Sequence, residues 1–231
     1  MAIFSVLLLT APPPGQSAEA GGAFIKVDGR ESVLRAVELF LNRENVKQIQ
    51  LVFLPEALEE GKRKYGGHLS FSGVKAVTGG PRWVDQVAAA AQKIAAECTH
   101  VILHDAARPA VAYSDIDALM EEAERHPVIS LATPCRAMLA EIDDGGAPMA
   151  FHPPGRFMQL LTPQAFSKER FAQWASSKQD PHASEFTLLK GSPFNIRVGS
   201  AADAGTVKTM LGLLPKPKVK PLSSPFEEAQ W

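Results

Sequence analysis

Apolar runs of strand length alternate with amphipathic segments of helical period between residues 2 and 132, and this alternation most limits how the chain can fold. The first run, residues 2–10, is continuously apolar, as expected of a strand buried on both faces of a parallel sheet. The later strand runs are 48–54, 74–78, 100–103 and 127–132. Helical spacing falls on 31–42, 56–65, 83–97 and a segment that opens at Ser114 with a capping box through Asp117. The pattern predicts an α/β protein with a doubly wound, mostly parallel sheet.

The alternation changes after residue 133. Asp144-Gly145-Gly146 is a hairpin turn signal between two short extended segments, and it predicts a projecting β-hairpin arm at about 135–156. We expect a helix over 168–177, a strand over 195–198 and a helix over 202–214. The sequence is therefore predicted to form one domain over 1–214, followed by a proline-rich, mobile tail at 215–231.

Composition limits the classes of partner. The 231 residues carry a net charge of −1, without the basic excess of a nucleic-acid-binding protein. The two cysteines have no metal-binding spacing and fit reduced thiols. The apolar N-terminal run is short for a signal peptide and lacks a basic region, and no stretch has the length of a membrane helix. A cytoplasmic protein with no nucleic-acid or membrane partner is expected.

Residues 101–111, VILHDAARPAV, place chemistry at the end of a predicted strand. Ligands of doubly wound sheets bind beyond the carboxyl ends of the strands, which is where Asp105 falls. A carboxylate there can hold Mg²⁺ beside phosphate oxygens, and Arg108 can bind a phosphate or order the loop. Small Ala106 and Ala107 would let a ligand approach the backbone. The alternative is an Asp that merely caps the turn.

The string HDAARP, together with Gly79-Gly80 upstream and LTPQAF at 161–166, resembles the 2-C-methyl-D-erythritol 4-phosphate cytidylyltransferase family. The resemblance runs in matching order over residues 3–214, including Asn195-Ile196-Arg197, where the family has Asn-Ile-Lys. It implies a Rossmann-like nucleotidyltransferase fold and a homodimer formed through the β-arm. It also implies cytidylyl transfer from CTP to a sugar-alcohol phosphate with Mg²⁺, releasing pyrophosphate, in isoprenoid precursor biosynthesis.

The resemblance also implies roles for particular residues. Asp105 is the expected metal ligand, and Lys26 and Arg197 are the expected catalytic cations. The acceptor phosphate is expected at Thr162 and Arg156. The nucleotide is expected at Ala11, Gly15, Gly79, Gly80, Asp105, Ala106 and Arg108.

Several positions depart from the family pattern. The loop after the first strand, APPPGQSAEAGGAFIKV, has three consecutive prolines without N–H donors, lacks the family's arginine and has Ala23 at its lysine position. Residues 137–140 are wholly apolar where the family holds the acceptor with a threonine. We therefore expect weak turnover. The alternatives are a catalytically silent homologue that keeps the dimeric scaffold, or a transferase for another nucleotide or acceptor. If prolines 12–14 fill the space that a triphosphate needs, the hypothesis that the protein is an enzyme fails.

Overall fold

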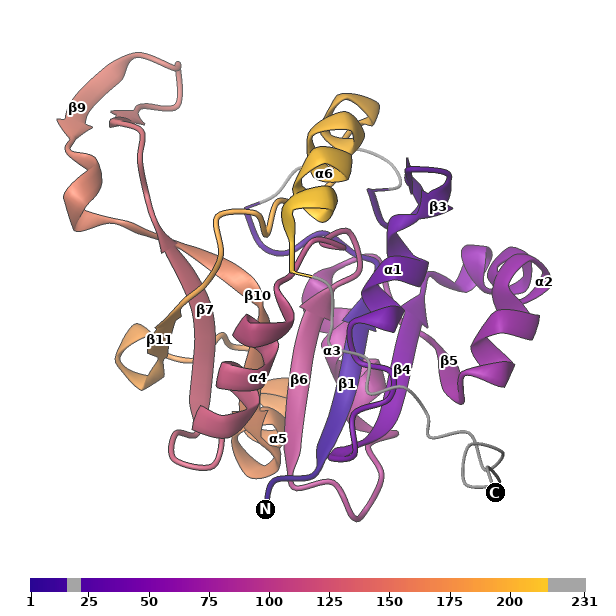
Figure 1. The fold of residues 1–231 in the computed structure, drawn as a ribbon. Helices are drawn as coiled ribbons and strands as arrows, with labels where there is room; N and C mark the ends of the chain where they lie inside the picture. The colour runs from indigo at the N-terminus through magenta and orange to yellow at the C-terminus, as the bar shows by residue number, and fades with distance from the viewer. Residues whose placement is uncertain (16–21, 216–231) are drawn as a thin grey trace, which may run out of the picture.

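A seven-stranded sheet organises the chain, in the order β11-β7-β10-β6-β1-β4-β5 (Figure 1). The computed structural model describes residues 1–15 and 22–215. Strand β10 is antiparallel to both of its neighbours, and the other neighbouring pairs are parallel, which confirms the predicted mostly parallel α/β sheet. The strands are β1 (Phe4–Leu9), β4 (Val46–Phe53), β5 (Val74–Thr78), β6 (His100–Asp105), β7 (Val128–Pro134), β10 (Met158–Ser167) and β11 (Thr187–Lys190).

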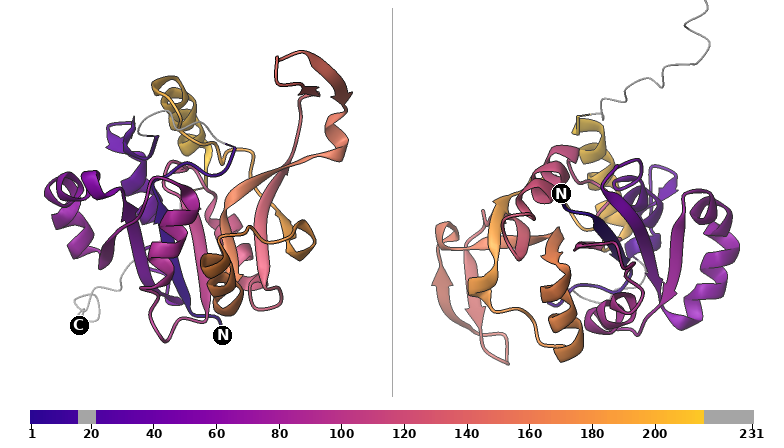
Figure 2. Two further views of the ribbon diagram at one scale, coloured as in Figure 1. Left: turned by 180° about the vertical axis from the view of Figure 1, so that it is seen from behind. Right: turned by 90° about the horizontal axis from the view of Figure 1, so that it is seen from below.

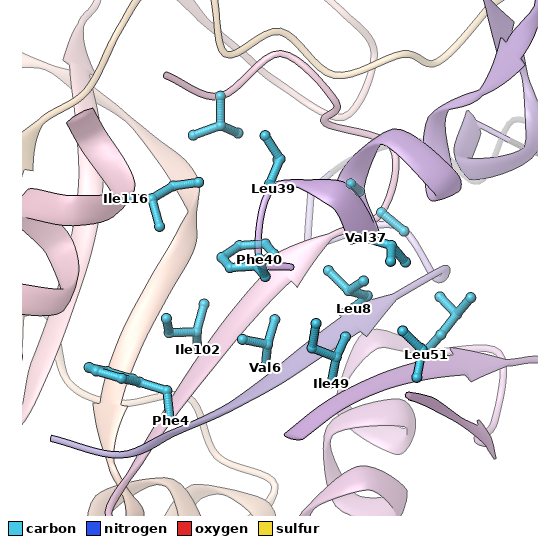
Figure 3. Close-up of a cluster of buried hydrophobic side chains, with 14 of the residues drawn as sticks. Phe4, Val6, Leu8, Val37, Leu39, Phe40, Ile49, Leu51, Ile102 and Ile116 are labelled. Atoms are coloured by element: carbon cyan, nitrogen blue, oxygen red, sulfur yellow. The ribbon is translucent and has the colours of Figure 1, made fainter. Parts of the chain in front are cut away.

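Helices cover both faces of the sheet, so β1 is buried along its whole length. One face packs against α1 (Ser32–Glu38), α2 (Pro55–Phe71) and α4 (Tyr113–Glu122). Figure 3 shows this cluster, in which Phe4, Val6 and Leu8 of β1 point the same way. The alternate residues Leu7 and Leu9 belong to a second cluster with α3 (Trp83–Ala91) and α5 (Lys168–Ser177).

A small layer lies over the carboxyl ends of β1 and β6. It contains α6 (Ala201–Leu213) and a two-stranded ribbon of β2 (Lys26–Val27) and β3 (Arg30–Glu31), as Figure 1 shows. Val207 of α6 packs with Val27 and Val198, and the Val198 N–H donates to the Ala107 carbonyl over 2.8 Å. The segment that leads into α6 is thereby tied to the loop after β6.

The predicted hairpin is present as an arm that projects from β7 and β10 (Figure 2). It pairs β8 (Leu139–Ile142) with β9 (Pro148–His152) in antiparallel register. Asp143 Oδ1 accepts from the Gly145 and Ala147 N–H groups, and Gly146 takes a positive φ of 84° that suits glycine.

Some predicted elements were wrong. Helix α4 begins at Tyr113 with Ala112 as its N-cap, and no side chain caps it, so the capping box at Ser114 is absent. Residues 195–198 form no strand; the edge strand is β11, which pairs with β7. Strand β10 was not predicted, because Thr162-Pro163 interrupts its apolar pattern. Most of the predicted tail, 216–231, lies outside the described residues.

Within the described ranges, none of the helices combines the length and apolarity that crossing a membrane requires.

Two glycines of α2 give a matched test of its packing. A Cβ at buried Gly61 would lie 2.6 Å from Phe53 Cε1, whereas one at exposed Gly67 would have no neighbour within 4 Å. We expect Gly61→Ala to lower the free energy of unfolding by about 1–3 kcal/mol through overpacking. Gly67→Ala should raise it by up to about 1 kcal/mol through helix propensity. Urea denaturation measures both, and a Gly61→Ala protein as stable as the parent would contradict this packing.

Candidate active site

Asp105 ends β6, and its carboxylate is wholly buried against two guanidinium groups. Arg197 Nε donates to Oδ2 over 2.9 Å, and Arg108 Nε lies 3.6 Å from the same oxygen. The Ala107 N–H donates to Oδ1 over 2.9 Å. Two cations against one anion leave an excess of positive charge at the carboxyl edge of the sheet, the place where α/β proteins bind ligands.

Polar contacts around Asp105 form a closed ring across three segments. The Asp105 N–H donates to Thr162 Oγ1 over 3.0 Å, and Asn195 Nδ2 donates to the Thr162 carbonyl over 2.7 Å. Arg108 Nη1 in turn donates to the Asn195 carbonyl over 2.8 Å. Strand β6, strand β10 and the segment before α6 are therefore locked together at the cluster. Thr162 binds its own chain here, and its predicted acceptor role stays a prediction.

Burial sets the charge balance of the cluster. Burial raises the pKa of the Asp105 carboxyl, while Arg197 and Arg108 act in the opposite direction by favouring the carboxylate. Burial likewise lowers the pKa of the Arg108 guanidinium, against the pull of Asp105. Removing either partner of such a pair leaves an uncompensated buried charge, at a cost of about 3–5 kcal/mol.

His104, the residue before Asp105, is a structural tie. Its Nε2–H donates to the Arg108 carbonyl over 3.0 Å, and its ring meets the Phe40 ring edge-on. Burial lowers the pKa of His104 to about 3, so the imidazole is neutral at pH 7. It fixes the reversal of the chain from Asp105 to Arg108.

Asp105 was predicted to bind a magnesium ion, so the groups around its carboxylate should suit that ion. Mg²⁺ prefers carboxylate, phosphate and water oxygens in octahedral geometry. Both Asp105 oxygens already accept N–H groups, and the nearest charged neighbours are cations. In residues 1–15 and 22–215, no group of three or more His, Cys, Asp or Glu side chains is placed to hold a metal. As arranged, these residues do not fit a resident magnesium ion.

Gly79 and Gly80 make room for α3. A Cβ at Gly79 would lie 2.8 Å from Gln86 Cα, and one at Gly80 would lie 2.8 Å from Asp85 Cβ. Packing of the chain against itself thus requires both glycines, whether or not a nucleotide lies against them. The predicted nucleotide contact at these positions stays a prediction.

Gln86 directs the chain that leaves β1, a role that was not predicted. Its buried Oε1 accepts from the Thr10 N–H over 3.0 Å and from the Ala11 N–H over 3.1 Å. Ala106 is likewise buried under its own chain. No simple sequence signal marks Gln86, because its partners lie 75 and 76 residues away.

Three predicted site residues are exposed. Lys26 lies in β2 opposite Glu31, and Arg156 lies in η2 (Pro154–Arg156) at the base of the arm. Gly15, with a positive φ of 77°, is the last described residue before the gap at 16–21. None of the three forms a hydrogen bond or ion pair with Asp105 among the contacts the structure describes.

A cavity of about 470 Å³ opens beside the cluster. Arg108 and Thr162 line it, and Pro13 and Pro14 form part of its wall. Aromatic side chains supply much of the remainder, among them Trp83 and Trp174, which the sequence analysis did not place at a site. The cavity escaped prediction because its walls come from segments far apart in the chain.

A sequence profile of the 2-C-methyl-D-erythritol 4-phosphate cytidylyltransferase family matches residues 7–203. The chain belongs to this family. The family member from Clostridioides difficile is 21% identical over 202 residues, which cover 82% of this chain and 85% of that protein. The one from Frankia casuarinae is 26% identical over 163 residues, which cover 68% of this chain and 59% of the relative, less than two thirds of its length.

Solved structures agree on the fold. The 4-diphosphocytidyl-2C-methyl-D-erythritol synthase of Anaerococcus prevotii superposes with a TM-score of 0.75 at 15% identity, covering 91% of this chain and 96% of that chain. The 2-C-methyl-D-erythritol 4-phosphate cytidylyltransferase of Thermus thermophilus gives 0.69 at 20% identity, with coverages of 91% and 98%. The predicted family and its nucleotidyltransferase fold are thereby confirmed.

The depressed pKa of His104 predicts a pH dependence of stability. The folded protein keeps this ring neutral down to pH about 3, whereas an unfolded histidine takes up a proton below its ordinary pKa of 6.5. The unfolded state therefore binds more protons in that window, and stability falls as the pH falls. Between pH 7.5 and pH 5 the free energy of unfolding of the parent should fall. We expect this fall to be smaller by about 1–2 kcal/mol in the His104→Gln protein. Urea unfolding at several pH values gives both slopes, and parallel slopes would contradict a neutral buried His104.

Proposed function

We propose that this chain transfers the cytidylyl group of CTP to 2-C-methyl-D-erythritol 4-phosphate, the reaction for which its family is named. The observation that carries the proposal is the buried Asp105 with Arg197 and Arg108 over it, at the carboxyl end of β6. The chain leaves β1 toward β4 on one side and returns to β6 on the other, so this end is a topological switch point. Ligands of doubly wound sheets bind at such points.

In the proposed reaction an oxygen of the acceptor phosphate attacks the α-phosphorus of CTP. The new P–O bond forms as the bond to the β-phosphate breaks, and pyrophosphate leaves with the electron pair. Arg197 donates to Asp105 through Nε. The two terminal nitrogens of Arg197 form no hydrogen bond with any of the described residues. A guanidinium held in this way presents a fixed fork to the phosphates. The chemistry rests on positioning and electrostatics.

The remaining roles keep their predicted assignments. Ala11, Gly15, Gly79, Gly80 and Ala106 would border the nucleotide. Thr162 and Arg156 would hold the acceptor, and Lys26 would add a second catalytic charge. Mg²⁺ stays the predicted cofactor and would be supplied with CTP, since Asp105 as arranged does not fit it. A cytoplasmic location stays a prediction.

Turnover is expected to be weak. Asp105 engages Arg197, and residues 137–140 are exposed, apolar side chains that offer the acceptor no hydrogen bonds. The same observations favour the second candidate, a catalytically silent homologue. Calorimetry with CTP separates the two, because a silent scaffold would show no binding that depends on Arg197.

Arg197 gives the sharpest test of the proposed reaction. We expect Arg197→Met to lower the rate of pyrophosphate release from CTP and 2-C-methyl-D-erythritol 4-phosphate about 10²–10³-fold, the usual effect of removing one charge-stabilising donor. Arg197→Lys should recover part of the rate, since it restores the charge without the fork. The assay is run with and without Mg²⁺, and UTP serves as the competing nucleotide.

Arg125→Met is the control, because Arg125 is an exposed cation whose ion pairs among the described residues are with Glu121 and Glu122 of its own segment. Thermal midpoints show whether each variant is folded. An Arg197→Met protein with the parent rate would exclude Arg197 from the reaction. A parent protein that releases no pyrophosphate would favour the silent homologue.

We infer that the arm joins two copies of this chain. Its exposed apolar side chains are unusual on a free surface, and a two-stranded hairpin gains stability by packing. Large apolar residues with exposed fractions of 60% or more on and beside the hairpin are Met138 (66%), Ile142 (60%), Met149 (65%) and Phe151 (68%).

Phe151→Glu should convert a dimer to a monomer, because a charge would then be buried in the apolar contact. Phe71→Glu is the matched control, since Phe71 is 94% exposed on α2, outside the arm. Light scattering after gel filtration gives both masses. A parent protein that is monomeric at micromolar concentration would contradict the inferred dimer.

A further inference from the structure

We propose that Asp203, in the first turn of α6, is a positioning residue for Arg197 in the cytidylyl transfer proposed above. The inference rests on that proposed function and adds to it a residue that touches no substrate. Arg197 must keep its two terminal nitrogens directed away from Asp105 if they are to bind phosphate oxygens. Asp203 supplies a second carboxylate beside the same guanidinium.

Asp203 fixes the chain two residues after Arg197. Its Oδ2 accepts from the Gly199 N–H over 2.9 Å, from the Ser200 N–H over 2.8 Å and from the Ser200 hydroxyl over 3.0 Å. The Ser200 Oγ accepts in return from the Asp203 N–H over 3.3 Å, which completes a capping box at the start of α6. One carboxylate oxygen thus takes three donors, and the backbone at residues 199 and 200 cannot turn without losing them.

The residue directly after Arg197 is bound on the side of the sheet. The Val198 N–H donates to the Ala107 carbonyl over 2.8 Å, in the loop after β6. Arg197 therefore enters a short stretch of chain that is tied to the sheet at Val198 and to α6 by the capping box. Of these two ties, the one at Asp203 also brings a negative charge.

The Asp203 carboxylate acts on the Arg197 guanidinium as well as on the backbone. A Cβ at Gly199 would lie 3.4 Å from Asp203 Oδ2 and 3.6 Å from Arg197 Nη1, so both groups border the same small space. Hydrogen bonds from Gly199 and Ser200 lower the pKa of the Asp203 carboxyl, and the Arg197 charge contributes in the same direction, so Asp203 is ionised at pH 7. Arg197 is therefore attracted by Asp105 at Nε and by Asp203 on the Nη1 side.

Loss of Asp203 would leave Asp105 as the carboxylate that directs Arg197. A guanidinium and a carboxylate pair most strongly through two parallel hydrogen bonds. Without the second attraction, Arg197 would turn a terminal nitrogen onto Asp105 as well, and that donor would no longer be available to the phosphates. A change at Asp203 is thus expected to act on turnover through Arg197.

The test compares Asp203→Asn, which keeps an acceptor oxygen for the N–H groups, with Asp203→Ala, which removes both the acceptor and the charge. We expect kcat for pyrophosphate release from CTP and 2-C-methyl-D-erythritol 4-phosphate to fall about tenfold in the first and about 10²-fold in the second, the effect of a small misplacement. The KM for CTP should change less, because Arg197 is proposed to act on charge that develops in the transition state.

Asp28→Asn is the matched control. Asp28 Oδ1 lies 2.9 Å from Nζ of Lys208, so this variant also removes a carboxylate charge that is paired with α6, but at a later turn of the helix. It should keep the parent rate. Thermal midpoints show whether each variant is folded.

A double-mutant cycle separates positioning from a merely structural role. In an Arg197→Met background, Asp203→Asn should have little further effect on the rate, because the side chain that it positions is absent. Equal fold losses in the two backgrounds would overturn the proposal. Parent values of kcat in both Asp203 variants would overturn it as well.

Crystal structures of the parent and of Asp203→Ala give a readout that needs no turnover, and Asp203→Asn replaces Asp203→Ala if the latter does not fold. We expect a terminal nitrogen of Arg197 to reach hydrogen-bond distance of Asp105 in the variant and not in the parent. An Arg197 side chain in the same place in both would overturn the proposal. A parent protein that releases no pyrophosphate contradicts the proposed reaction, and the two crystal structures still decide whether Asp203 positions Arg197.

Discussion

The ion pair between Asp105 and Arg197 joins the two parts of the chain on which the site depends. Asp105 belongs to the last position of a central strand, whereas Arg197 lies 92 residues later, in the segment that leads into α6. A buried carboxylate is costly unless its oxygens are satisfied, and here the Arg197 guanidinium and the Ala107 N–H donate to them, while Arg108 adds a second positive charge 3.6 Å away. The layer that contains α6 is held to the sheet by the Asp105–Arg197 ion pair and by the hydrogen bond from the Val198 N–H to the Ala107 carbonyl.

This arrangement explains why the loop after β6 carries the residues it does. The His104 ring donates to the Arg108 carbonyl and so turns the chain back over its own strand. Ala107 is small because the segment at Gly22 passes close to it. A Cβ on Gly22 would lie 3.3 Å from the Ala107 Cβ. The string HDAARP is therefore a packing motif as well as a chemical one, and its packing role does not depend on any bound ligand.

The sequence predicted those parts of the fold that rest on local pattern. A continuous apolar run marked β1, a short run closed by Gly79-Gly80 marked β5, and Asp144-Gly145-Gly146 marked the hairpin, because each signal lies within a few residues. Strand β10 and the ring from Asp105 to Asn195 were out of reach, since they depend on which distant segments meet. The family resemblance supplied Arg197 as a catalytic cation, but no local pattern could show that its nearest anion is Asp105.

The positive charge of this site is partly used by the protein itself, and this limits what an incoming nucleotide can gain. A triphosphate must compete with Asp105 for Arg197, and with the Asn195 carbonyl for Arg108. The guanidinium groups nevertheless outnumber the carboxylate, so the cluster still attracts anions. Because Arg108 is buried, Arg197 is half-buried and both are held by hydrogen bonds before any ligand arrives, they need little reorganisation to stabilise charge. Weak turnover would then reflect the competition of Asp105 for Arg197, the apolar side chains of residues 137–140, and prolines 12–14, which give the phosphates no N–H groups.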